Sequence, residues 1–274
     1  MNKLVTITIP IYKSEPDKYE LISLMQCIKI LYNYDFSIVC PQSLDTNYYE
    51  SKFIANNINY TIHRFEDYHF DNVDEYSSLL INIDFYNKFK EYEYILIHQL
   101  DAYVFKDELE YWCSLGYDYI GAPLMDYQPY GTNLKLKKVG NGGFSLRRTQ
   151  VFIERLNYPY PIKSFKVIWK DYGSYSFFQK IIRIPVMTAR ALGYRNSMRY
   201  FSKKVIANED IFWCVLHEQT KQRLNLPDID TAAKFSVEAE AQQFYEKNRS
   251  TLPFGCHAWQ KQESDFWRNF IPFP

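Results

Sequence analysis

Hydrophobic and polar residues alternate along the first hundred positions with a period that switches between that of a strand and that of a helix. Residues 4–10 are β-branched and alternate, which predicts a first strand ending at Pro10. Apolar residues recur at helical spacing over 19–31 and over about 74–89, which predicts two amphipathic helices. Short apolar runs typical of further strands occupy 36–40, 60–65 and 94–97.

This order of strands and helices predicts an α/β protein. Strands separated by helices favour a single Rossmann-like, mostly parallel sheet flanked by helices. After residue 105 the rhythm loosens into short segments with several Pro and Gly. Because no linker separates two independent units, we expect one domain over residues 1–274.

Composition narrows the class of protein. The 274 residues include 32 Lys and Arg against 32 Asp and Glu, so the formal charge is zero and a nucleic-acid partner is not expected. The apolar fraction of 47% suits a folded chain, and no apolar stretch is long enough to span a bilayer. Five scattered cysteines and no apparent secretory signal lead us to expect buried, reduced thiols and a cytoplasmic location.

The zero net charge is unevenly distributed. Residues 158–207 contain ten Lys and Arg and a single acid, Asp171. One interpretation is a solvated surface segment. The other is a basic, aromatic surface that meets an anionic acceptor or the inner leaflet of a membrane, which would make the protein peripheral at that face.

Polar residues follow the fourth predicted strand directly. In an open α/β sheet, ligands bind beyond the carboxyl ends of the strands, so Gln99 and Asp101 are candidate site residues. A carboxylate there can hold Mg²⁺ or Mn²⁺ together with substrate phosphates. Asp101 could equally cap the following turn.

Three later segments carry further candidate chemistry. Residues 140–147 form a glycine-rich loop, which either lets the backbone approach a ligand closely or is an ordinary tight turn. Glu209 and Asp210 begin a predicted helix, where acids are favoured by the helix dipole but could also supply a general base. His257 lies in a glycine-containing turn between aromatic residues, a setting that could complete a metal site.

Taken in order, these segments resemble a nucleotide-sugar-dependent glycosyltransferase of the GT-A fold, and in particular the bacterial family labelled DUF5672. The segments that carry the resemblance are Thr8–Tyr12, Tyr94–Ala102, Tyr119–Pro123, Gly140–Arg147, Asn208–Asp210, Phe235–Glu238 and Pro253–Trp259. The resemblance implies a nucleotide-binding half over 1–105. It also implies an acceptor-binding half over 106–274 with a basic insertion at about 158–207.

The resemblance also implies roles for individual residues. Asp210, or its neighbour Glu209, would be the catalytic base of an inverting transfer. Asp101 and His257 would be the ligands of Mn²⁺ or Mg²⁺, although Gln99 stands where such enzymes usually carry the first acid of an Asp-x-Asp pair. Donor binding would fall to Pro10, Ile11, Tyr12, Gln99, Asp101, Gly142 and Gly143, and acceptor binding to Trp213, Phe254 and Trp259.

The function that follows is transfer of a sugar from a nucleotide-sugar to a hydroxyl group of a glycan or glycolipid, as in polysaccharide or lipopolysaccharide biosynthesis. UDP-sugars are favoured only because they are the commonest donors in this class. A protein that kept the fold but binds sugar or nucleotide without turnover is the alternative. A metal-dependent phosphohydrolase would need more acids than Asp101 at the strand end, and the sequence has no Gly-x-Ser-x-Gly elbow of a serine hydrolase.

Overall fold

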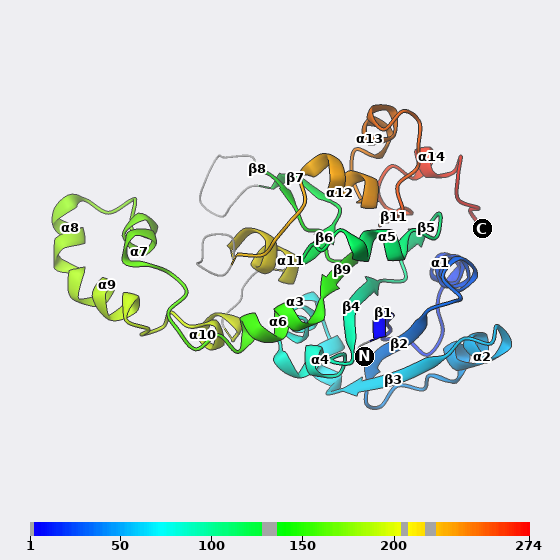
Figure 1. Cartoon of the computed structure of the whole chain (residues 1–274), viewed down its shortest axis with the longest axis horizontal. Helices are drawn as coiled ribbons and strands as arrows, with labels where there is room; N and C mark the ends of the chain where they lie inside the picture. Colours follow the sequence, from blue (N-terminus) through cyan, green and yellow to red (C-terminus); the bar gives the residue numbers. More distant parts are fainter. Residues whose placement is uncertain (1–2, 128–135, 204–207, 217–222) are drawn as a thin grey trace.

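A six-stranded sheet forms the centre of the computed structural model, which describes residues 3–127, 136–203, 208–216 and 223–274 (Figure 1). Its strands are β1 (Lys3–Pro10), β2 (Asp35–Pro41), β3 (Tyr60–Phe65), β4 (Tyr92–His98), β6 (Tyr119–Gly121) and β9 (Phe144–Arg148), in the order β3-β2-β1-β4-β9-β6. The first four strands are parallel, and β9 runs antiparallel to both β4 and β6. The predicted α/β fold with a mostly parallel sheet is confirmed.

Helices cover both faces of this sheet. Along β4, Tyr94 and Leu96 point into one apolar core, whereas Ile95 and Ile97 point into another. The helices on the first face are α1 (Lys18–Ile30), α2 (Asn47–Ala55) and α5 (Leu109–Ser114), and those on the second are α3 (Val73–Leu79), α4 (Ile83–Asn87) and α6 (Thr149–Leu156). The continuous apolar run of β4 is therefore explained by burial on both sides.

The helix predicted over residues 74–89 is interrupted. It divides into α3 and α4, and the side chain of Asn82 accepts a hydrogen bond from the backbone N–H of Asp84 at 3.0 Å. Asn82 thus caps a new helix, because an Asn side chain satisfies an N–H group that has no intrahelical partner. Leu79, Leu80, Phe85 and Tyr86 still pack in one core, so the apolar spacing survives the break.

Two small sheets lie beside the central one. The strands β5 (Ala102–Val104), β10 (Ser236–Val237) and β11 (Gly255–His257) pair in the order β10-β11-β5, which sets His257 opposite Ala102. The other sheet pairs β7 (Pro123–Tyr127) with β8 (Leu136–Val139). Outside residues 164–195, the other helical segments are η1 (Asp67–Phe70), α10 (Met198–Ser202), α11 (Glu209–Ile211), the π-helical turn η2 (Phe212–Leu216), α12 (Ile229–Phe235), α13 (Ala241–Lys247) and α14 (Ser264–Trp267).

Residues 164–195 project from the rest of the molecule as a lobe of three helices, α7 (Phe165–Asp171), α8 (Phe177–Ile182) and α9 (Ile184–Ala191) (Figure 1, left). Buried Asn196 closes the base of the lobe: its side chain donates to the Lys163 carbonyl at 2.8 Å and accepts from the Lys163 N–H at 3.0 Å. The end of the predicted basic segment, 204–207 with Lys204, lies outside the described residues.

All five cysteines are buried, as the sequence predicts. In the part of the chain that the structure describes, no helix is long and apolar enough to cross a membrane.

Candidate functional site

A cavity of about 520 Å³ opens at the carboxyl ends of β1 and β4. These two strands pair in parallel, with Thr8 opposite Ile97, so the residues that follow them emerge side by side. The cavity is lined by four predicted donor-binding residues, Pro10, Tyr12, Gln99 and Asp101, and by two lysines that received no predicted role, Lys13 and Lys261.

Ile11, the remaining predicted donor-binding residue of the first strand end, does not line this cavity. Its side chain is buried in the core, and its N–H donates to the Val39 carbonyl at 2.9 Å. Extended backbone alternates the direction of successive side chains, so Ile11 points inward while Tyr12, which is 60% exposed, points out.

The glycine-rich loop reaches the same place from β9. The Gly143 carbonyl accepts a hydrogen bond from the Gln99 N–H at 2.9 Å, because β9 starts where β4 ends. A Cβ atom at Gly142 would lie 2.1 Å from Oε1 of Glu209, and one at Gly143 would lie 2.1 Å from Nε2 of His257. Both positions therefore require glycine. The loop lies between the two candidate catalytic bases, Glu209 and Asp210, and the predicted metal ligand His257.

Asp101 and His257 meet in a network of charged side chains. Nε2 of His257 lies 3.0 Å from Oδ1 of Asp101, and its Nδ1 lies 3.2 Å from Oε1 of Glu238. Burial alone would lower the pKa of His257, but the two carboxylates outweigh it and raise that pKa to about 9. The imidazole is therefore a cation at neutral pH.

Lys261 completes the network. Its Nζ donates to Oδ2 of Asp101 at 2.9 Å. Although burial acts in the opposite direction, His257 and Lys261 hold the pKa of Asp101 well below its usual range. Asn141 donates to the second oxygen of Glu238 at 2.7 Å, so the acids of the cluster are held from several sides.

The side chains that would hold the expected divalent cation are engaged with other side chains. Both oxygens of Asp101 bind His257 or Lys261, so a cation at Asp101 and His257 would have to displace the Lys261 ammonium group and a proton of the imidazole. The lining of the cavity has four acids, Asp17, Glu20, Asp71 and Asp101, against two lysines, Lys13 and Lys261. Within the described residues, no group of three or more His, Cys, Asp or Glu is arranged to hold a metal ion.

Glu209 and Asp210 lie on the other side of the loop, at the start of α11. Glu209 is buried and accepts a hydrogen bond from Nη2 of Arg147 at 2.7 Å. The Arg147 guanidinium also donates to the Tyr86 hydroxyl at 3.1 Å and lies 5.0 Å from the centre of the Tyr119 ring. Arg147 opposes the uptake of a proton by Glu209, but burial outweighs it and raises the pKa of this carboxyl group.

No cationic side chain of the described residues forms an ion pair with Asp210. Its side chain is 9% exposed, and burial together with the neighbouring charge of Glu209 raises its pKa to about 7. A carboxyl group with a pKa near neutrality is suited to general-base chemistry. Asn208 stands at the N-cap position, yet its side chain makes no capping hydrogen bond.

The three aromatic residues predicted to bind the acceptor do not face a cavity. Trp213, Phe254 and Trp259 are fully buried in the apolar cores. Trp259 donates its indole N–H to Ser23 at 3.0 Å. These rings offer no face on which a sugar could stack, so the structure corrects this part of the prediction.

Several residues of the site were missed as functional residues. Arg147 and Glu238 lie within segments that carry the family resemblance, but nothing in their local sequence distinguishes a buried ion-pair partner from a surface charge. Lys261 lies four residues after His257, and no pattern marks it. Only the folding of the chain brings these charges to one edge of the sheet.

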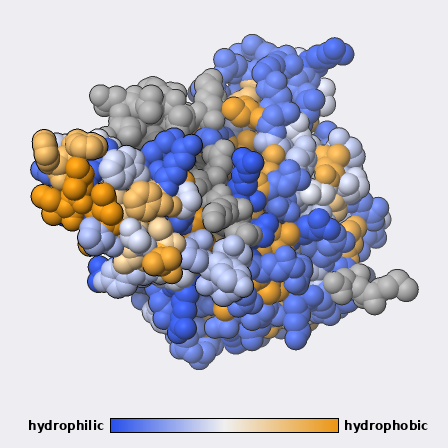
Figure 2. Space-filling view, turned by 60° about the vertical axis from the view of Figure 1, so that its left-hand side comes forward, coloured by the Kyte–Doolittle hydropathy of each residue, from blue (hydrophilic) through white to orange (hydrophobic). Residues whose placement is uncertain are grey.

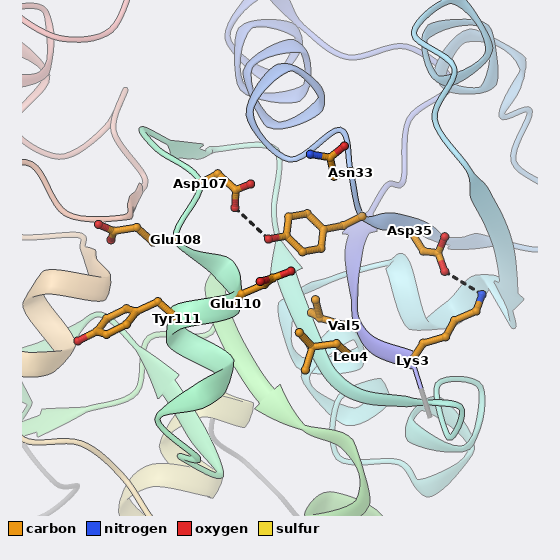
Figure 3. A pocket seen from close by; sticks show the side chains of 10 residues that line it. Lys3, Leu4, Val5, Asn33, Asp35, Asp107, Glu108, Glu110 and Tyr111 are labelled. Atoms are coloured by element: carbon orange, nitrogen blue, oxygen red, sulfur yellow. Dashed lines mark hydrogen bonds and ion pairs between the residues drawn. The ribbon is translucent and has the colours of Figure 1, made fainter. Parts of the chain in front are cut away.

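A second hollow, of about 710 Å³, lies at the opposite end of β1 (Figure 3). An ion pair between Lys3 and Asp35 at 2.8 Å and a hydrogen bond from Tyr34 to Asp107 at 3.0 Å lie along it. It faces the amino ends of the parallel strands, where open α/β sheets do not place their ligands. The cavity beside Gln99 and Asp101 is therefore the candidate active site.

The parallel sheet, its antiparallel strand β9 and the site at their shared edge define an α/β protein of the GT-A fold. The chain belongs to the family described as "Protein of unknown function (DUF5672)", whose model matches residues 59–257. No protein with a curated description matches the sequence.

Two solved structures are similar to this chain over nearly its whole length. Apo mouse xyloside xylosyltransferase 1 is 9% identical, with 98% of this chain and 99% of that chain covered and a TM-score of 0.50. The glycosyltransferase GlyE of Streptococcus pneumoniae TIGR4 is 13% identical, over 99% of this chain and 58% of that one, with a TM-score of 0.47.

Another similar structure is that of S. aureus TarS 1-349 in complex with UDP-GlcNAc. It is 15% identical, over 54% of this chain and 46% of that one, with a TM-score of 0.34. This chain thus spans about half the length of the TarS 1-349 chain that it matches.

Proposed function

We propose that this protein is a glycosyltransferase that transfers a sugar from a nucleotide-sugar to a hydroxyl group of a glycan or glycolipid, with inversion. The observation that carries the proposal is the pairing of a cavity at the carboxyl ends of β1 and β4 with Asp210, a carboxyl group with a pKa of about 7, across one glycine loop. The GT-A fold supports it by analogy.

Several residues of the cavity would contact a nucleotide diphosphate, although the lining also has the acids Asp17, Glu20 and Asp71. The exposed ring of Tyr12 is available to stack on the base, and the side-chain amide of Gln99 can hydrogen-bond a ribose hydroxyl. Lys13 and Lys261 would face the phosphates, and Pro10 would shape the wall beside the base. The backbone of Gly142 and Gly143 would lie against the donor sugar.

In the proposed step, the acceptor oxygen forms a bond to the anomeric carbon while the bond from that carbon to the diphosphate oxygen breaks. The electron pair of the broken bond leaves with the nucleoside diphosphate. Asp210 takes the proton of the acceptor hydroxyl, which requires the carboxylate form and is consistent with a pKa of about 7. Glu209 remains paired with Arg147 and is not the base.

In this proposal, the positive charge beside the leaving group comes from side chains of the Asp101 cluster and not from a divalent cation. Lys261 and His257 place positive charge where the leaving group would develop its negative charge. A glycolipid acceptor would bring the protein to a membrane face within the cytoplasm.

The test begins with thermal-shift measurements against UDP, GDP and CMP, each with Mn²⁺ or with EDTA, since a bound nucleotide raises the melting temperature. Release of nucleotide from the corresponding sugar donors, with glycan and lipid extracts as acceptors, then measures turnover. We expect binding and release of one nucleotide, with EDTA leaving both unchanged. If a nucleotide binds and no donor is consumed with any acceptor, the protein is a non-catalytic nucleotide-binding protein. If no nucleotide binds, the proposal is refuted.

A further inference from the structure

The lobe formed by residues 164–195 exposes apolar side chains that its own helices leave uncovered. More than half of the large apolar side chains exposed in the described part of the chain lie between residues 165 and 194. Phe178, Ile182 and Leu192 are 78%, 77% and 80% exposed. In Figure 2, this apolar surface gathers at the outer end of the lobe, at the left of the view. Exposed apolar patches of this kind mark interaction sites.

The charge around this surface has one sign. The lobe carries six basic residues against a single acid, Asp171, and that acid is paired with Lys163 at 2.9 Å. None of the six basic side chains forms an ion pair with a carboxylate of the described residues; they are Lys166, Lys170, Lys180, Arg183, Arg190 and Arg195. Three of them lie over aromatic rings instead: Lys180 at 5.4 Å from Trp169, Arg183 at 4.8 Å from Tyr175 and Arg195 at 5.2 Å from Tyr194.

The lobe is not needed to complete the central cores. Its buried side chains, Ile168 and Met187, belong to neither core of the central sheet. The hydrogen bonds between Lys163 and Asn196 hold its two ends together. The exposed apolar residues are therefore free to contact a surface outside the molecule.

We propose that this lobe docks on an anionic lipid membrane, with Phe177, Phe178 and Ile182 of the α8 region inserted at the headgroup level. Exposed aromatic and aliphatic side chains surrounded by unpaired Lys and Arg have the composition of surfaces that lie in the interface of anionic bilayers. The uncompensated positive charge favours a membrane over an apolar protein partner. An anionic bilayer supplies negative charge in its headgroups and an apolar interior beneath them. The contact is peripheral and does not depend on glycosyl transfer.

Vesicle flotation tests the proposal with the intact protein and no nucleotide. The probes are vesicles of pure phosphatidylcholine and of an equal mixture of phosphatidylcholine and phosphatidylglycerol. We expect recovery with the anionic vesicles only, and release at high salt because salt screens the attraction. Equal recovery with both kinds of vesicle, or with neither, would overturn the proposal.

Three variants separate the contributions. Replacing Phe177, Phe178 and Ile182 by Ser should weaken binding to anionic vesicles by about tenfold or more. K180Q together with R183Q should weaken it by about thirtyfold, given that each basic residue contributes about fivefold. The matched control replaces three equally exposed residues elsewhere by Ser, namely Tyr32, Ile54 and Tyr111, and should bind as the unmodified protein does.

All substituted positions except half-buried Lys180 are exposed, so melting temperatures should agree. Light scattering reports the oligomeric state. A dimer that the Phe177, Phe178 and Ile182 variant dissociates, found without vesicle binding, would assign this surface to a second copy of the chain and reject the membrane. Loss of binding in the control variant would likewise reject the assignment to the lobe.

Discussion

Glu209 and Asp210 are neighbours in the sequence with different partners in the folded protein. Burial raises the pKa of both, but Glu209 is paired with Arg147, whereas burial and the charge of Glu209 raise the pKa of Asp210 to about 7. The sequence identified both as acids at a helix start but could not separate them, because the partner of Glu209 lies 62 residues away along the chain. The distinction between ion-pair partner and base is therefore a property of single residues in the folded state.

Replacing Asp210 by Asn tests the base at this scale. The substitution keeps the shape but removes the proton acceptor, so we expect nucleotide release to fall at least about tenfold, while donor affinity changes little. Asp265→Asn, at a fully exposed position on α14, is the matched control and should have the activity of the unmodified protein. Turnover by Asp210→Asn at the normal rate would remove this residue from the base role.

Substitution of Lys261 tests whether a side-chain cation, and not a metal ion, provides the positive charge at Asp101. Lys261→Met removes the charge at 2.9 Å from Oδ2, so nucleoside diphosphate binding measured calorimetrically should weaken by about tenfold, and Lys261→Arg should restore most of it. Both measurements are made in EDTA. Binding that is unchanged in Lys261→Met, or that requires Mn²⁺ in the unmodified protein, would contradict the role given to this lysine.

The protonated state of His257 should be visible in the pH dependence of stability. Its pKa in the folded protein, about 9, is higher than the ordinary value of 6.5, so the folded state binds the proton more tightly. This stabilisation is fully present below pH 6.5 and is lost as the pH rises to about 9, by at most about 3 kcal/mol. Urea unfolding at several pH values should give a steeper decline in that window for the unmodified protein than for His257→Gln, and parallel curves would contradict the pairing.

At the scale of elements, the apolar pattern predicted the strands well and the helices less well. The continuous apolar run Tyr94–Ile97 predicts a strand buried on both faces, and β4 is such a strand. The helix expected over 74–89 divides at Asn82, whose side chain caps the start of α4. The apolar spacing continues through this break and therefore gives no sign of it. The glycine loop depends on elements far apart in sequence, since β9, β11 and α11 approach each other there.

Gly143→Ala tests this close approach. The added methyl group would lie 2.1 Å from Nε2 of His257, and the ring is held by Asp101 and Glu238, so it has little freedom to move. We expect a loss of about 1–3 kcal/mol in the free energy of unfolding and weaker donor binding. Gly173→Ala is the control, because its methyl group would come no closer than 3.1 Å to any neighbour. Similar behaviour of the two variants would show that the loop tolerates a side chain.

The whole molecule combines a sheet domain with a lobe that is closed at its base. Lys163 and Asn196 hold the ends of the lobe together, and its buried residues are separate from the cores of the sheet (Figure 1). The uneven charge of the sequence indicated a distinct basic segment over 158–207, but only the structure separates its outer part as a projecting unit. The expectation of a single domain over 1–274 remains a proposal for the whole chain.

Replacing residues 164–195 by a short Gly linker should therefore leave the sheet domain folded. We expect one cooperative unfolding transition, a melting temperature lowered by no more than about 4 °C, and nucleotide affinity close to that of the intact chain. Calorimetry measures all three. Aggregation, or a loss of the cooperative transition, would show that the lobe is part of the main fold.

The sequence by itself determined the α/β fold class, because the fold class follows from the local periodicity of apolar residues. Its resemblance to a family named the acids, glycines and histidine of the candidate site. Tertiary structure alone decided which charges pair. It buried Trp213, Phe254 and Trp259, paired Glu209 with Arg147, and placed Lys261 against Asp101 where a metal ion was expected. Burial and ion pairing depend on residues distant in sequence, and the strength of a charge interaction depends on how much water folding removes.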